Sequence, residues 1–230
     1  MRVSTGSELI DDILEGGLEP EVTTTIYGPS GSGKTNIAIL AALYNAGKKK
    51  VIFIDTEGGF SIDRAKQLFT DHEERINNLI ISTPNSFFEQ SEIFNKLEEV
   101  SKEKDIGLIV VDSISMLYRL EKGEREAYDV NKELARQLSI LRKISHDKKI
   151  PILLTNQVYA DFENSSNIKM VGGDLMKYTS KCIIQLRTDL TGRKLTLVKH
   201  RSIPPKRVNF EITSKNIIES SGTKKYDFIY

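Results

Sequence analysis

Positions 28 to 35 read Gly28-Pro29-Ser30-Gly31-Ser32-Gly33-Lys34-Thr35. This order fits the pattern G-x-x-x-x-G-K-[ST], in which the backbone N–H groups of a glycine-rich loop surround phosphate oxygens. The lysine of that pattern contacts the outer phosphates, and the hydroxyl after it ligates Mg²⁺. A β-branched segment at 23–27 and an apolar segment at 36–46 flank the loop as a strand and a helix would, which disfavours a ligand-free turn. We therefore expect these eight residues and Asn36 to bind a nucleoside triphosphate at a helix start.

The composition is that of one globular α/β domain spanning residues 1–230. The chain is 28% charged and 39% hydrophobic, with a net charge of +1, so any contact with nucleic acid has to come from a local basic patch. A single cysteine, Cys182, excludes an internal disulfide and favours a reducing, cytoplasmic location. It lies in an apolar run, which favours a core thiol over a nucleophile. We find no signal peptide and no stretch long enough to span a membrane.

Apolar runs at 51–55, 108–112 and 152–156 are continuous, as in strands that are buried on both faces. Segments with helical periodicity separate them, which predicts a mostly parallel twisted sheet flanked by helices. The last third lacks such helices, and we expect 181–187, 193–199 and 207–213 to be antiparallel strands at the sheet edge. The tail, 214–230, is polar with an aromatic end and is compatible with a strand, a docking segment or disorder.

Polar side chains follow three of the predicted strands. Asp112 ends one strand, where a phosphate-loop protein places a Mg²⁺-organising carboxylate. Glu57 follows the strand at 51–55 and could orient or deprotonate the water that attacks the γ-phosphate, although the residues alone favour a solvated loop glutamate. Gln157 follows the strand at 152–156 and is either a γ-phosphate sensor or a satisfied polar residue at the sheet rim.

Four further segments occur in a familiar order around the phosphate loop. They are Ser4-Thr5-Gly6-Ser7-Glu8-Leu9-Ile10-Asp11, Ile54-Asp55-Thr56-Glu57-Gly58-Gly59-Phe60, Leu154-Thr155-Asn156-Gln157-Val158 and Gly172-Gly173-Asp174. Together they resemble the ATPase core of the RecA/RadA recombinase superfamily, over about residues 2 to 213. We see no helix-hairpin-helix domain and no linker phenylalanine motif before the core. The chain is most similar to an archaeal paralogue of the main recombinase that consists of the core alone.

The resemblance implies roles for several residues. Lys34 and Glu57 correspond to catalytic residues, Gln157 to the γ-phosphate sensor, and Arg64 to an arginine that stacks on adenine. It also implies two DNA-binding loops, at about 118–127 and 159–171. The second is shorter than in strand-exchanging recombinases, which argues against full strand exchange.

Lys199 and Arg201 resemble a K-x-R element that reaches the ATP of a neighbouring subunit in related ATPases. They also belong to a basic stretch without acidic residues, which runs from Arg193 to Arg207. Contact with a neighbour's ATP and contact with a DNA backbone are equally compatible with this pattern.

The resemblance implies an ATP- and Mg²⁺-dependent DNA-binding protein of homologous recombination. It would act as an accessory to the main recombinase, bind single-stranded DNA and hydrolyse ATP weakly, as a monomer, homodimer or weak oligomer. An alternative is an adaptor that binds ATP without hydrolysing it and acts by binding the recombinase or other repair proteins. A small-molecule kinase is disfavoured because no feature indicates a phosphate acceptor.

Overall fold

The computed structural model describes residues 1–103, 105–124, 126–159, 169–220 and 227–228. Its helices are α1 (Glu8–Ile13), α2 (Lys34–Ala46), α3 (Ile62–Leu68), α4 (His72–Asn77), α5 (Phe87–Glu103), α6 (Met116–Glu124), α7 (Ala127–Lys148) and α8 (Gly173–Thr179). Its strands are β1 (Thr23–Tyr27), β2 (Lys50–Asp55), β3 (Leu79–Ser82), β4 (Ile106–Asp112), β5 (Ile152–Asn156), β6 (Val158–Tyr159), β7 (Lys169–Met170), β8 (Cys182–Asp189), β9 (Gly192–Lys199), β10 (Lys206–Ile212), β11 (Ile217–Glu219) and β12 (Asp227–Phe228).

One large sheet has the strand order β11-β10-β9-β8-β1-β5-β4-β2-β3, and β12 also pairs with β10. The strands from β8 to β3 in this order are parallel, whereas β9, β10 and β11 are antiparallel to their neighbours. The register places Tyr27 beside Asn156 and Asp55 beside Asp112. The carboxyl ends of four neighbouring strands therefore meet at one edge of the sheet, where parallel sheets bind their ligands.

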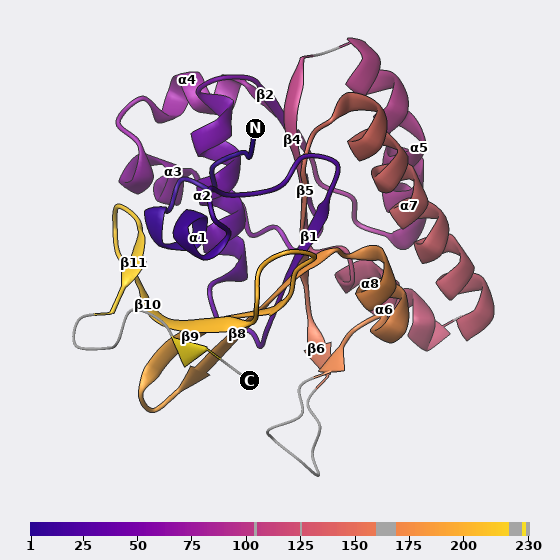
Figure 1. Ribbon diagram of the computed structural model, residues 1–230. Helices are drawn as coiled ribbons and strands as arrows, with labels where there is room; N and C mark the ends of the chain where they lie inside the picture. The colour runs from indigo at the N-terminus through magenta and orange to yellow at the C-terminus, as the bar shows by residue number, and fades with distance from the viewer. Residues whose placement is uncertain (104, 125, 160–168, 221–226, 229–230) are drawn as a thin grey trace.

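Helices cover both faces of the sheet (Figure 1). Helices α1 to α4 lie on one face, and the core on that side includes Ile13, Ile37 and Phe53. Helices α5 to α8 lie on the other face, where Phe94, Leu138 and Ile109 belong to the second core cluster. None of the helices in the described ranges is long and apolar enough to cross a membrane.

The predicted fold class, a mostly parallel sheet flanked by helices with antiparallel C-terminal strands, is confirmed. One strand has the wrong predicted direction, because β8 runs parallel to β1 and only β9 begins the antiparallel part. A parallel connection needs a crossover, and α8, which the sequence analysis did not predict, supplies it. In the tail, the structure places β11 and β12, both on β10.

The first predicted DNA loop, 118–127, is also wrong in part. Residues up to 124 belong to α6, and α7 begins at Ala127. Leu117 and Tyr118 are buried, and the Tyr118 hydroxyl donates to Asn131 Oδ1 of α7 at 2.6 Å. This packing orders a segment whose composition indicates a loop. Most of the second predicted loop, residues 160–168, lies outside the described residues.

Candidate nucleotide-binding site

The phosphate loop joins β1 to α2, and its glycines are needed for its shape. A Cβ atom at Gly28 would lie 2.6 Å from Leu186 O, and one at Gly33 would lie 2.7 Å from Ile212 Cδ1. Gly31 and Gly33 have φ angles of 74° and 107°, which L side chains rarely adopt. Gly33 is the N-cap of α2 and gives no side-chain cap, so the first N–H groups of the helix stay available to an anion.

The other residues of the predicted loop take distinct positions around this turn. Pro29 is half-buried and Ser30 is exposed, whereas Ser32 is fully buried beneath the loop. Thr35 and Asn36 are half-buried in the first turn of α2. The structure therefore arranges 28–36 as one continuous loop and helix start, as the sequence predicts.

The Lys34 ammonium is folded back over the loop. Its Nζ donates to Gly28 O and to Pro29 O, each at 2.9 Å. The side chain is buried, and burial lowers the pKa of Lys34, while the nearby carboxylates of Glu57 and Asp112 oppose this shift. Because carbonyl oxygens are neutral acceptors, phosphate oxygens would replace them as stronger partners for this cation.

Asp112 is buried at the end of β4 and has one free oxygen. The Thr155 hydroxyl of β5 donates to Asp112 Oδ1, whereas Asp112 Oδ2 is buried without a hydrogen-bond partner. Burial raises the pKa of Asp112, against the opposing effect of the hydroxyls of Thr155 and Thr35. A Cβ atom at Gly59 would lie 3.0 Å from Thr35 Cγ2 and 3.7 Å from Asp112 Oδ2, so these two side chains meet beside Gly59.

This pair fits an ion that shares its ligands with a nucleotide. Within the described ranges, no group of three or more His, Cys, Asp or Glu side chains is placed to hold a metal by itself. Mg²⁺ usually binds through one or two protein oxygens, water and substrate phosphates. The Thr35 hydroxyl and the free Asp112 oxygen supply that kind of donor set.

Glu57 lies on a short turn that is organised by Asp55, the last residue of β2. Asp55 Oδ1 accepts from Glu57 N at 3.2 Å and from Gly59 N at 3.0 Å, and Asp55 Oδ2 accepts from Phe60 N at 2.9 Å. The backbone that holds Glu57 is therefore fixed by a buried carboxylate at the end of the preceding strand, β2. The Glu57 side chain itself is exposed at the sheet edge.

Glu57 and Gln157, which are 100 residues apart in sequence, are in direct contact. Glu57 Oε1 accepts from Gln157 Nε2 at 2.8 Å and from Ser113 Oγ at 2.7 Å. The Gln157 backbone N–H donates to Ser115 Oγ at 3.0 Å, which ties the end of β5 to the start of α6. The Gln157 carbonyl also accepts from Val171 N at 3.0 Å. This bond joins the residue before β6 to the residue after β7, next to the antiparallel pairing of these two strands.

One cavity of about 280 Å³ lies beside the phosphate loop. It is lined by Gly28, Ser30, Lys34, Glu57, Arg119, Gln157 and Val158. The structure thus brings three separately predicted side chains, Lys34, Glu57 and Gln157, to one hollow. Sequence reasoning missed Arg119, because it placed that residue in a DNA loop. The structure places Arg119 in the first turn of α6, where its N–H donates to Ser115 O at 3.0 Å.

Arg64 lies apart from this cavity, at the far end of β10. Its Nη1 donates to Thr213 O at 2.9 Å, to Ser214 O at 3.1 Å and to Gln67 Oε1 at 3.0 Å. Its Nε and Nη2 are buried without partners, and burial lowers the pKa of Arg64. The guanidinium is therefore fixed by backbone carbonyls, with part of its hydrogen-bonding capacity unused.

Lys199 and Arg201 do not approach the chain's own phosphate loop. Lys199 pairs with Ile183 at the start of β8, whereas the phosphate loop follows the end of β1. Lys199 Nζ donates to Lys177 O at 2.6 Å and Ser180 O at 2.9 Å, at the C-terminal end of α8. Arg201 forms an ion pair with Glu19 at 3.0 Å. Both residues thus lie near the amino-terminal ends of the parallel strands, at the edge of the sheet opposite to the phosphate loop.

Comparison with known proteins shows the family of this chain. The Rad51 family model matches residues 1–220. The chain belongs to the Rad51 family. The DNA repair and recombination protein RadB of Methanobrevibacter smithii is 41% identical over 91% of this chain and 92% of that protein. The RadB of Methanosphaera stadtmanae is 39% identical over 94% and 95%.

A solved structure gives the same assignment. The crystal structure of the RadB recombinase has a TM-score of 0.79 and 32% identity, and it covers 95% of this chain and all of that one. The resemblance to an archaeal core-only paralogue of the recombinase, inferred from the motifs around the phosphate loop, is therefore confirmed, and that paralogue is RadB.

Proposed function

We propose that this Rad51-family chain is an ATP-dependent DNA-binding protein of homologous recombination and repair, and an accessory to the main recombinase. One observation supports this most directly: Glu57 and Gln157 form a hydrogen bond of 2.8 Å beside the phosphate loop and line one cavity with Lys34. The names of its RadB relatives support the recombination role. The proposed ATPase is one domain with a core at 2–213 and an extension at 214–230.

The proposed reaction is phosphoryl transfer from ATP to water. The N–H groups of the phosphate loop and Lys34 bind the phosphates, with Thr35 and Asp112 as ligands of Mg²⁺, which neutralises charge on the phosphates when bound. Glu57 orients the attacking water and accepts its proton. Since Ser113 and Gln157 already fix one oxygen of Glu57, its other oxygen is free for that water. Arg64 is proposed to lie against adenine.

Gln157 is the proposed link between the nucleotide and DNA. Its side chain donates to Glu57, and its backbone carbonyl accepts from the N–H of Val171, the residue after β7. A γ-phosphate that binds the Gln157 side-chain amide would break its hydrogen bond with Glu57. The backbone of Gln157, and with it the start of β6 and the end of β7, would then shift. ATP would thereby change the affinity for single-stranded DNA, an order–disorder type of switch.

A second candidate is an adaptor that binds ATP without turning it over. The position of Lys199 and Arg201 supports it, because a hydrolytic cation from these residues requires a second subunit. In this alternative the nucleotide stabilises the fold and the surface that binds the recombinase. The contact between Glu57 and Gln157 has no role there, so we favour the ATPase.

Steady-state ATP hydrolysis with and without single-stranded DNA, measured beside nucleotide affinity, tests the proposal. We expect slow hydrolysis that DNA accelerates. In Lys34→Ala, nucleotide binding should weaken about 100-fold, because a desolvated charge contact contributes about 2–5 kcal/mol. Lys96→Ala, at an exposed lysine of α5, is the matched control. Tight ATP binding without turnover in either condition favours the adaptor, and unchanged affinity in Lys34→Ala contradicts both candidates.

A further inference from the structure

A second cavity, distinct from the nucleotide site, lies between the N-terminal halves of α5 and α7. Its volume is about 310 Å³, at the lower end of the range of about 300–1,000 Å³ for ligand pockets. Apolar side chains, three carboxylates, one arginine and two neutral polar residues line it: Phe87, Phe88, Val130, Glu92, Asp129, Glu133, Arg136, Ser91 and Asn95. None of its lining residues also lines the nucleotide cavity. The two cavities are therefore separate.

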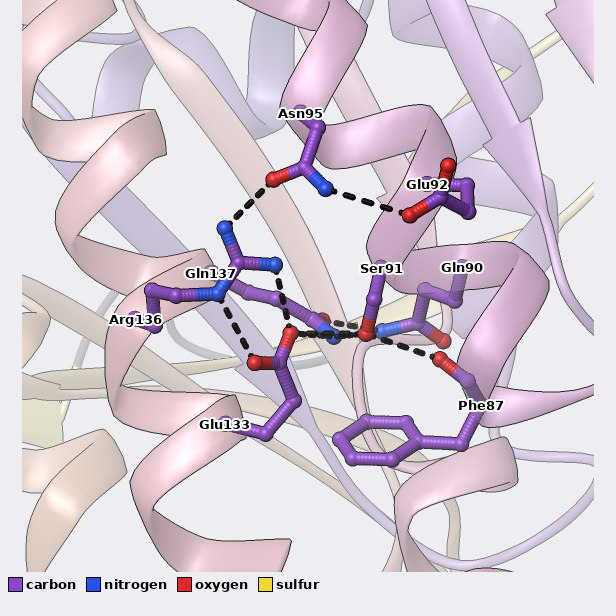
Figure 2. Close-up of polar contacts among 8 residues, drawn as sticks. All are labelled: Phe87, Gln90, Ser91, Glu92, Asn95, Glu133, Arg136 and Gln137. Carbon is purple, nitrogen blue, oxygen red and sulfur yellow. Dashed lines mark hydrogen bonds and ion pairs between the residues drawn. The ribbon is translucent and has the colours of Figure 1, made fainter.

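The wall of this cavity is held in place by a network between the two helices (Figure 2). Glu133 accepts from Arg136 Nε and Nη2, each at 2.8 Å, and from Ser91 Oγ of α5 at 2.6 Å. Arg136 Nη1 donates to Asn95 Oδ1 of α5 at 2.5 Å. Burial raises the pKa of Glu133, but the hydrogen bonds from Arg136, Ser91 and Gln137 outweigh it and leave this pKa below its ordinary value. The wall is thus rigid and ionised before any ligand arrives, which lowers the entropic cost of binding.

The charge of the cavity is not balanced. Arg136 forms an ion pair with Glu133, and all three of its guanidinium nitrogens are engaged. Glu92 accepts one bond from Asn95 Nδ2 at 3.3 Å, and neither Glu92 nor Asp129 has an ion-pair partner within the described ranges. Both carboxylates are exposed at the mouth. The cavity is therefore negative, so it repels phosphate groups and attracts a cation.

Aromatic side chains complete the chemistry. Phe88 lines the cavity and is 72% exposed, so it offers an apolar ring at the mouth. Phe87 is buried beneath and packs edge-on against Tyr118 at a centroid distance of 6.2 Å. Lysine and arginine combine an apolar stem with a charged head, and the head also binds to aromatic faces. An apolar floor, an exposed phenylalanine and the two carboxylates of Glu92 and Asp129 at the mouth match such a side chain.

We propose that this cavity binds the arginine or lysine side chain of a partner-protein segment, with an apolar neighbour of that residue covering Phe88. The carboxylates of Glu92 and Asp129 bind the cationic head, and Glu133 shapes the wall. A single anchoring side chain in a rigid pocket is typical of the residues that dominate weak protein interfaces. The proposal does not depend on ATP, because the two cavities share no lining residue.

NMR titration of the ¹⁵N-labelled full chain with the dipeptide acetyl-Arg-Phe-amide tests this proposal. We expect shifts of backbone amides around positions 87–95 and 129–136, with a Kd on the order of 1 mM for so small a probe. Acetyl-Glu-Phe-amide should give no such shifts. The double variant Glu92→Gln/Asp129→Asn keeps the shape of the mouth and should bind the arginine probe about fivefold more weakly, given the usual strength of exposed charge pairs.

The matched control is Glu99→Gln/Asp147→Asn, which removes two exposed carboxylates from the same two helices away from the cavity. It should bind as the parent does. Equal binding of both dipeptides, equal loss of affinity in both double variants, or absence of shifts at millimolar probe would overturn the proposal. Shifts of the same amides by a single-stranded oligothymidylate would also overturn it, in favour of a nucleic-acid surface. ATP affinity, measured in parallel, should be unchanged in both double variants.

Discussion

Glu57 has the contacts of a carboxylate that positions water, because one of its oxygens is fully engaged and the other is not. Glu57→Gln should therefore keep ATP affinity within about twofold while slowing turnover roughly 10²–10⁴-fold, the usual contribution of a general base. Single-turnover hydrolysis beside nucleotide affinity measures the two effects separately. Ser113→Ala, which removes one bond to Glu57 Oε1, is the control and should slow turnover far less. Turnover at the parent rate in Glu57→Gln would show that Glu57 is not the base.

The raised pKa of Cys182 gives the stability of the fold a pH dependence. Burial raises the pKa of its thiol to about 12, against about 8.5 in an unfolded chain. The folded state thus holds the thiol proton more tightly than the unfolded state does. The contribution of this protonated thiol to the free energy of unfolding is complete below about pH 8.5 and is lost as pH rises toward 12.

The comparison with Cys182→Ala tests this, because alanine does not titrate. The stability advantage of the parent over the variant should be constant up to about pH 8 and then fall by at most about 1.4 kcal/mol per pH unit. Chemical unfolding at pH 7, 8.5 and 10 measures the difference. A thiol reagent at pH 8 should label the chain only after unfolding, and equally fast labelling of the native chain would contradict the burial of this thiol.

Among the elements, α5 and α7 are joined by an unusual buried polar layer. Gln90 and Gln137 are both fully buried and share a bond of 2.6 Å, and Gln137 Nε2 donates to Ser91 Oγ at 2.9 Å (Figure 2). Gln90 Oε1 has no partner among the described residues. Replacing one of two hydrogen-bonded buried side chains lowers the free energy of unfolding more than replacing both, because the remaining polar group is left buried without a partner.

We therefore expect Gln137→Leu to lower the free energy of unfolding by about 1–3 kcal/mol, because it leaves the Gln90 amide without its acceptor. The double variant Gln90→Leu/Gln137→Leu should recover most of that loss. Urea denaturation of both single variants and the double variant gives the coupling energy. Strictly additive effects would show that the two amides do not act as a unit.

At the scale of the whole molecule, Lys199 and Arg201 lie at the edge opposite to the phosphate loop, so any contact they make with ATP has to come from a second copy. Lys199 also caps α8, which makes Arg201 the cleaner residue to test. If the contact is made in trans, Arg201→Ala and Lys34→Ala are each inactive alone, but a mixture regains up to about a quarter of parent ATPase activity. In an equal mixture, about a quarter of the interfaces combine an intact phosphate loop from an Arg201→Ala subunit with an intact Arg201 from a Lys34→Ala subunit.

Analytical ultracentrifugation of the same samples shows whether the mixture assembles. Recovery of activity assigns Arg201 to a neighbour's nucleotide. Loss of DNA affinity in Arg201→Ala, with ATPase activity intact and no complementation, assigns it to a DNA backbone instead. The slope of the logarithm of DNA affinity against the logarithm of salt concentration should then be smaller by about one, because one phosphate contact is lost.

The sequence by itself determined the phosphate loop, the parallel strands, the family resemblance and the residues at the strand ends. Each of these follows from local rules: glycine spacing, apolar runs, and a side chain placed where a strand stops. Only the tertiary structure decided that Glu57 and Gln157 touch, that Arg119 faces the nucleotide cavity, that β8 is parallel, and that Lys199 lies at the far edge. These depend on strand order and on packing between distant segments, and no local pattern in the chain encodes which strand lies beside which. The same reason explains the segment at 118–124: its composition favours a loop, but the burial of Leu117 and Tyr118 against the helices of its own layer makes it a helix.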